Sequence, residues 1–129
     1  MDKILIIDDN PNDVEITRVA LAEKGWNLEI KSAKRCDIAL EGLRNEEDLP
    51  FLIILDLKIP GMSGIDCLKE IRADRKLQNI PVAVVTSSSH PADRKDALAA
   101  GASDYLYKAF DFDQYGDDLS TMINRFKKD

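Results

Sequence analysis

Polar side chains that could do chemistry follow three short apolar runs and one short tyrosine-rich segment of this 129-residue chain. They are Asp8 and Asp9 after residues 4–7, Asp56 after 51–55, Thr86 after 81–85, and Lys108 after 104–107. Three carboxylates around one lysine repel one another unless a cation neutralises them. Mg²⁺ binds such oxygens, usually through one or two carboxylates and several waters. The lysine and the hydroxyl are suited to hold the oxygens of a phosphoryl group.

The same set of groups could support phosphoryl transfer to Asp56. A carboxylate can act as a nucleophile and form an aspartyl phosphate. Positioning and charge neutralisation supply most of the catalysis in such a transfer. The competing interpretation is that Asp56 only begins a loop, because Asp is common in turns. The apolar run before it leaves these two interpretations evenly balanced.

Several other kinds of site are missing from the sequence. The chain has no G-x-x-x-x-G-K-[ST] loop, no G-x-G-x-x-G after the first apolar run, and no G-x-S-x-G elbow. The single histidine, His90, precedes a proline, and we expect a solvated loop residue there rather than a ligand or a base.

The apolar runs are short and uninterrupted, which predicts strands that are buried on both faces. A weaker alternating segment, 27–32, predicts a strand near a sheet edge. Helical spacing and start and stop residues such as Pro11 and Gly25 predict the intervening helices. These are 11–25, 35–45, 65–74, 91–101, and a last helix that begins near 111. Ile38 and Phe112 are expected on the inward faces of their helices.

Strand and helix therefore alternate five times, which predicts a doubly wound α/β fold with a parallel sheet and helices on both faces. In such sheets ligands bind at the carboxyl ends of the strands. The polar groups described above are expected to meet at that edge. We expect residues 1–129 to form one domain, because the sequence shows no linker or low-complexity segment.

Composition limits the partners and the compartment. The net charge of −6 disfavours nucleic acid, and no apolar run approaches the ~20 residues of a membrane span. The N-terminus has no signal-peptide pattern. Cys36 and Cys67 lack metal-ligand spacing, so we expect buried, unpaired thiols in a reducing compartment, although the sequence leaves a disulfide open. These features favour a cytoplasmic protein.

The motifs, taken in order, resemble the receiver domains of bacterial two-component response regulators, the family of the chemotaxis response regulator. Asp8-Asp9 matches the acidic pair of that family, Asp56 its phosphoacceptor, and Thr86 its hydroxyl switch residue. The segment 60–64, Pro-Gly-Met-Ser-Gly, is similar to its P-x-M-x-G loop, and 100–108 is similar to the approach to its lysine. The resemblance covers the whole chain.

This resemblance implies a flavodoxin-like three-layer (βα)5 fold with strand order 2-1-3-4-5. It implies that Asp9, Asp56 and the backbone carbonyl of Lys58 hold Mg²⁺, with Asp8 acting through water. A histidine kinase or a phosphotransfer protein would donate the phosphoryl group. Thr86 would then move toward the phosphate, and Tyr105 would turn inward and change the face formed by 91–101, 104–107 and the last helix. From the residues alone, Tyr105 is a half-buried strand aromatic.

The sequence departs from the family pattern beside Lys108. The family usually has proline next, often after a cis bond, and here Ala109 takes that position. A cis bond before alanine costs about 2.5–4 kcal/mol, against about 0.5–1 before proline. The bond is therefore either trans, with a shifted loop, or strained. Ser63 also replaces an acid that is commoner in the family, and Lys58 and Ser88 occupy positions that in the family tune loss of the phosphoryl group.

We therefore expect a phosphorylation switch rather than an enzyme. The chain ends after the last helix, which predicts a single-domain regulator, a monomer or weak homodimer, that acts on an unidentified output protein. Two alternatives stay open. A Mg²⁺-dependent phosphohydrolase often has a second Asp two residues after its nucleophile, where this chain has Lys58, and a receiver-like scaffold that is never phosphorylated would tolerate Ala109. The sequence identifies neither the kinase nor any longer parent chain.

Overall fold

The computed structural model describes residues 2–108 and 111–127. Five parallel strands form one sheet in the order β2-β1-β3-β4-β5. The strands are β1 (Lys3–Ile7), β2 (Glu29–Ala33), β3 (Leu52–Leu55), β4 (Val82–Thr86) and β5 (Asp104–Tyr107). The predicted fold class and strand order are confirmed, with bounds close to those expected.

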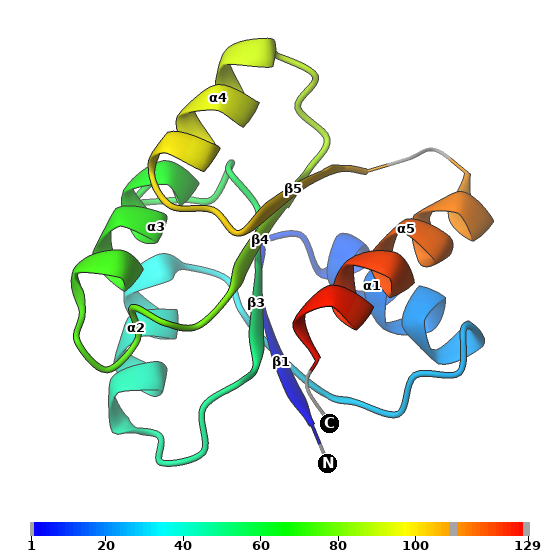
Figure 1. The fold of residues 1–129 in the computed structure, drawn as a ribbon, viewed down its shortest axis with the longest axis horizontal. Coiled ribbons are helices and arrows are strands. Elements are labelled where there is room, and N and C mark those ends of the chain that lie inside the picture. Colours follow the sequence, from blue (N-terminus) through cyan, green and yellow to red (C-terminus); the bar gives the residue numbers. More distant parts are fainter. Residues whose placement is uncertain (1, 109–110, 128–129) are drawn as a thin grey trace.

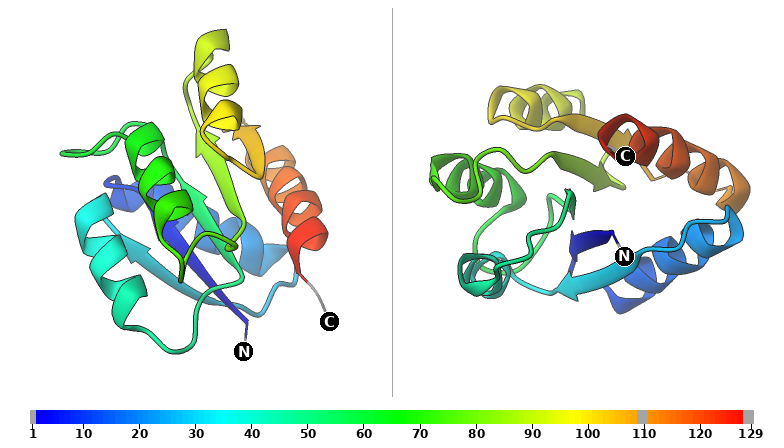
Figure 2. Two further views of the ribbon diagram at one scale, coloured as in Figure 1. Left: turned by 60° about the vertical axis from the view of Figure 1, so that its left-hand side comes forward. Right: turned by 60° about the horizontal axis from the view of Figure 1, so that its bottom comes forward.

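Helices cover both faces of the sheet (Figures 1 and 2). They are α1 (Pro11–Glu23), α2 (Cys36–Asn45), α3 (Gly64–Ala73), α4 (Pro91–Ala99) and α5 (Phe112–Phe126). α1 and α5 lie side by side on one face, and α2, α3 and α4 cover the other. None of the described helices is long and apolar enough to span a membrane.

Side chains at the helix starts explain where the helices begin. The Asn10 side chain accepts hydrogen bonds from the backbone N–H groups of Asn12 and Asp13, and Pro11 opens α1. Ser63 caps α3 by accepting from the N–H of Asp66. His90 is exposed, as predicted, and its Nδ1 caps α4 by accepting from the N–H of Ala92 at 3.2 Å.

The core consists of one large apolar cluster on each face of the sheet. All residues of β3 and β4 are buried, whereas the edge strand β2 is largely exposed. The predictions that Ile38 and Phe112 face inward are wrong, because these side chains are 55% and 37% exposed. The inward stripe of α2 follows the helical repeat through Cys36, Ala39, Leu40 and Leu43, and Ile38 lies off that stripe.

The two cysteines are paired, so the prediction of unpaired thiols is wrong. Cys36 at the start of α2 and Cys67 in α3 are fully buried and form a disulfide, with their Cα atoms 5.8 Å apart. That separation lies in the normal range for a disulfide. The residues are 31 positions apart in the chain. The fold places α2 and α3 on the same face of the sheet, and this neighbourhood was not evident from the cysteine spacing.

Candidate functional site

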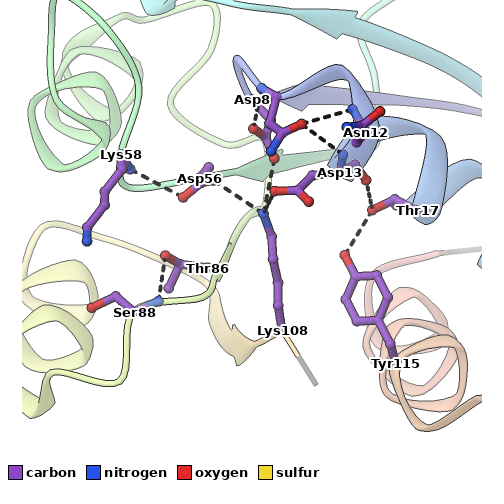
Figure 3. A network of polar contacts seen from close by, with 11 residues as sticks. Asp8, Asn12, Asp13, Thr17, Asp56, Lys58, Thr86, Ser88, Lys108 and Tyr115 are labelled. Atoms are coloured by element: carbon purple, nitrogen blue, oxygen red, sulfur yellow. Dashed lines mark hydrogen bonds and ion pairs between the residues drawn. The ribbon is translucent and has the colours of Figure 1, made fainter. Parts of the chain in front are cut away.

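Three carboxylates surround one lysine at the carboxyl edge of the sheet (Figure 3). The Nζ atom of Lys108 lies 3.1 Å from Asp8 Oδ2, 3.0 Å from Asp13 Oδ2 and 3.3 Å from Asp56 Oδ2. Asp8, Asp56 and Lys108 were predicted to meet here. Asp13 comes from the first turn of α1 and was not predicted.

The sheet itself positions three of these groups. The hydrogen-bond pattern continues one residue past each strand: the N–H of Asp8 donates to the carbonyl of Ala33, that of Asp56 to Ile7, and that of Lys108 to Thr86. The three distances are 3.0, 3.0 and 2.8 Å. Because each backbone is held to a neighbouring strand, the side chains start from fixed points.

The charges of the site are strongly coupled. Burial raises the pKa of the Asp8 carboxyl, although the N–H of Asn10 and the ammonium of Lys108 act in the opposite direction. Burial alone would lower the pKa of Lys108. The negative charges of Asp56 and Asp8, with hydrogen bonds to Asp13 and Asp8, outweigh burial, so the pKa of Lys108 is raised. The lysine therefore stays an ammonium, and its single positive charge faces three carboxylates.

This set of donors fits a hard divalent cation. One oxygen from each of Asp8, Asp13 and Asp56 lies within 4.8 Å of the others. Carboxylate oxygens are the ligands that Mg²⁺ prefers, and a second cation would relieve the excess negative charge. Asp9, which the family resemblance offered as a ligand, is exposed and is not in this group of described residues.

The loop after β3 keeps Lys58 beside Asp56. The N–H of Lys58 donates to Asp56 Oδ1 at 3.2 Å, while the Lys58 side chain is exposed. Gly64 makes the loop tight, since a Cβ atom there would come within 2.6 Å of the Asp56 carbonyl oxygen. The backbone N–H of Lys58 therefore lies beside Asp56, and the role of its carbonyl as a metal ligand stays a prediction.

Thr86 lies at the end of β4 beside the charged cluster (Figure 3), and Tyr105 lies on the neighbouring strand β5. Among the described residues neither hydroxyl is hydrogen-bonded to the cluster. The hydroxyl of Thr86, which is 1% exposed, accepts from the N–H of Ser88 at 3.2 Å. The half-buried ring of Tyr105 packs on the small cluster that contains Val84 and Ala97. Its hydroxyl is buried without a hydrogen-bond partner among the described residues, and burial raises its pKa. An unpartnered buried hydroxyl is unfavourable, so this ring position is one that a modest change could shift.

The sequence contains a signal for Asp13. Pro11 predicts a helix that starts soon after the strand at 4–7, and Asp13 follows Pro11 by two residues. Since α1 begins where β1 ends, an acid in its first turn also lies at the carboxyl edge. The prediction about the Lys108–Ala109 bond falls on a residue outside the described ones and stays a prediction.

Comparisons with known proteins agree with this geometry. The chain is 31% identical to the probable transcriptional regulatory protein TcrX of Mycobacterium tuberculosis over 95% of this chain and 50% of that protein. It thus spans about half the length of such regulators. It is 34% identical to the chemotaxis protein CheY-3 of Vibrio cholerae, over 84% of this chain and 81% of that one.

Among solved structures, the phosphorylated cyanobacterial phytochrome response regulator RcpA superposes with a TM-score of 0.87 at 27% identity, over 97% of this chain and 93% of that one. The family model of the response regulator receiver domain matches residues 4–120. The chain belongs to the response regulator receiver family, the signalling domains of two-component systems.

Proposed function

We propose that Asp56 is the phosphoacceptor of this receiver domain. The observation that carries the proposal is the Asp56 carboxylate, fixed at the end of β3 and 3.3 Å from the ammonium of Lys108, beside two further carboxylates that suit Mg²⁺. Both a nucleophile and the groups that neutralise a phosphoryl charge therefore occupy one edge of the sheet.

The transfer makes one bond and breaks another. A carboxylate oxygen of Asp56 attacks phosphorus while the bond between phosphorus and the donor's imidazole nitrogen breaks, and the electron pair stays on that nitrogen. The product is an aspartyl phosphate. Mg²⁺, when bound, would neutralise charge on the phosphoryl oxygens, and Lys108 would donate a hydrogen bond to one of them. Following the family resemblance, we assign the metal to Asp9, Asp56 and the backbone carbonyl of Lys58, with Asp8 acting through water. Asp13, although one of its oxygens lies within 4.8 Å of those of Asp8 and Asp56, is assigned to Lys108 instead.

The proposed donor is a sensor histidine kinase or a phosphotransfer protein in the cytoplasm. RcpA is by name a phytochrome response regulator, and the similarity to it favours a phytochrome-type kinase as the donor. The output is a change in the face formed by α4, β5 and α5, driven by Thr86 and Tyr105. The alternative of a phosphohydrolase gains no support, because the exposed Lys58 occupies the position of its acid–base aspartate.

The test is phosphorylation by a small donor. Acetyl phosphate with Mg²⁺ should add one phosphate to the protein in intact-mass spectra, and chelation of the metal should prevent it. Asp56→Asn should accept none. Asp66→Asn removes an exposed carboxylate from the nearby first turn of α3 and is the matched control, which should be labelled normally. Undiminished labelling of Asp56→Asn would assign the nucleophile to another residue.

A further inference from the structure

The ammonium of Lys108 has three N–H donors, and three carboxylates occupy them. Two of these carboxylates, Asp8 and Asp56, directly follow strands. The third, Asp13, belongs to α1 and makes the shortest of the three contacts, at 3.0 Å. Figure 3 shows Asp13 on the α1 side of the lysine, across from Asp56.

The three carboxylates cannot all stay hydrogen-bonded to Lys108 once a metal ion is bound and Asp56 is phosphorylated. A phosphoryl group on Asp56 removes the charge of that carboxylate, and a metal ion would draw the strand-end acids toward itself. Lys108 must then donate to a phosphoryl oxygen while another anion still balances and restrains it. With the metal assigned to the strand-end acids and Lys58, Asp13 is the partner that remains with the lysine.

We propose that Asp13 is the positioning residue of Lys108, the anion that holds its ammonium toward a phosphoryl group on Asp56. This inference rests on the proposed function of Asp56. Position 109 strengthens the need for such a residue, because an alanine after the lysine does not restrict the backbone as a proline would. A contact on the ammonium itself can supply the restraint instead.

Hydrogen bonds hold the backbone of Asp13 in place within the first turn of α1. The Asn10 side chain caps the first turn of α1, accepting from the N–H groups of Asn12 at 2.9 Å and of Asp13 at 3.4 Å. The hydroxyl of Thr17 donates to the backbone carbonyl of Asp13 at 3.1 Å. Thr17 is in turn 2.9 Å from the hydroxyl of Tyr115 on α5 in a buried contact. The backbone of Asp13 is therefore held at both ends of the turn, which fixes the point from which its carboxylate reaches the lysine.

The main competing role for Asp13 is that of a metal ligand, since it belongs to the group of three carboxylates. The two roles differ in their dependence on Lys108. A positioning residue loses its effect when the lysine is removed, whereas a ligand or a merely structural residue keeps it. A double-mutant cycle measures this difference directly.

The experiment measures the affinity for beryllofluoride, which stands in for the phosphoryl group, at saturating Mg²⁺ by ¹⁹F NMR. Asp13→Asn should weaken binding roughly tenfold, as expected for one lost charge-assisted contact. In the Lys108→Gln background the same change should have less than about a twofold effect. Asp13→Glu keeps a carboxylate and should recover most of the affinity. Glu15→Gln removes an exposed carboxylate from the same helix and should change nothing.

Three results would overturn the assignment. These are unchanged affinity in Asp13→Asn, an equal loss with and without Lys108, and failure of Asp13→Glu to recover binding although its ¹H–¹⁵N spectrum is that of a folded protein. Failure of the wild-type protein itself to bind beryllofluoride or to be phosphorylated is a different result. It would overturn the proposed function, and the role of Asp13 with it.

Discussion

The two faces of the sheet are fastened in different ways. On one face a covalent bond between Cys36 and Cys67 ties α2 to α3 within a wholly apolar cluster. On the other face α1 and α5 meet through a second apolar cluster and a buried hydrogen bond between Thr17 and Tyr115. That second face also reaches the candidate site, because Thr17 donates to the backbone of Asp13 and Asp13 holds Lys108.

This difference indicates which face can respond to the site. A disulfide does not exchange partners during signalling, whereas a hydrogen bond contributes only about 0.5–1.5 kcal/mol and can be remade. A ligand shifts a conformational equilibrium only by its differential affinity for the two states. Small, exchangeable contacts that begin at the site are therefore suited to respond to phosphorylation. We expect the disulfide-linked pair α2 and α3 to stay fixed, but not α4, which lies on the same face of the sheet without a covalent link to them.

The largest expected effect is that of breaking the disulfide. Closing a loop of about this length stabilises a fold by about 3–4 kcal/mol in the chain-entropy model, so a reductant should lower the free energy of unfolding in urea by that order. The loss should be the same with and without Mg²⁺ and beryllofluoride, because the α2–α3 face is not coupled to the site. The double variant Cys36→Ala, Cys67→Ala should be insensitive to reductant.

Two results would change this picture of the α2–α3 face. A reductant effect that depends on beryllofluoride would show that the disulfide communicates with the site. Labelling of both cysteines when intact cells are alkylated before lysis, measured by mass spectrometry, would show that the pair exists in the cell as a dithiol.

The next effect in size is stabilisation by Mg²⁺. A cation that binds only the folded state adds about 2.7 kcal/mol to the free energy of unfolding when its free concentration is 100 times its dissociation constant. Asp9→Ala should lose most of this gain, and Asp13→Asn should lose less, because we assign Asp9 to the metal and Asp13 to the lysine. Asp37→Asn, at an exposed acid on the α2–α3 face, should keep it. Melting curves of the wild-type protein that do not respond to millimolar Mg²⁺ would count against the metal site. If Asp13→Asn loses more of the Mg²⁺ stabilisation than Asp9→Ala, then Asp13 rather than Asp9 is the metal ligand.

A smaller effect is expected from Tyr115→Phe, which keeps the buried ring and deletes the hydrogen bond to Thr17. The free energy of unfolding should fall by about 0.5–1.5 kcal/mol. Burial raises the pKa of Tyr115, so the folded state holds this proton more tightly than the unfolded state. Stability therefore falls as the pH rises above the ordinary pKa of tyrosine, about 10, and the variant should show a shallower alkaline decline.

The control for this variant is Ser120→Ala, which deletes the hydrogen bond from the Trp26 indole to Ser120 on the same face but away from the site. It should cost a similar amount and leave the alkaline decline unchanged. If Ser120→Ala makes the alkaline decline shallower to the same extent, the decline does not depend on the buried Tyr115 hydroxyl.

The sequence predicted the parts of this molecule that depend on local pattern. Uninterrupted apolar runs such as 52–55 specify buried parallel strands, and their alternation with helices specifies the layers, so the meeting of Asp8, Asp56 and Lys108 followed. Asp13 was missed because its position depends on how α1 is rotated about its axis as it leaves the sheet. The cysteine pairing depends on which helices share a face, and that is a property of the tertiary structure.

The smallest expected effect is a redistribution of conformations controlled by Thr86, with little change in stability. The hydroxyl is buried and now accepts from the N–H of Ser88. To donate to a phosphoryl oxygen, the end of β4 must shift, and the Tyr105 ring, whose hydroxyl lacks a partner, can move into the space released. One charge-assisted hydrogen bond, about 1.5–3 kcal/mol, is sufficient to shift a population without locking it.

Beryllofluoride should therefore move backbone NMR resonances at 86–90, beside the site, and at 97–107, along α4 and β5, while resonances of 36–45 in α2 stay in place. Thr86→Ala should keep the first set of shifts and shrink the second, because the analogue still binds Asp56 but the strand end is no longer drawn toward it. Thr86→Ser retains the hydroxyl and is the matched control, which should keep both sets. If Thr86→Ala leaves the shifts at 97–107 at full size, the hydroxyl is not the coupling element. Asp13 and the α1–α5 contacts would then be the remaining route from the site to the rest of the fold.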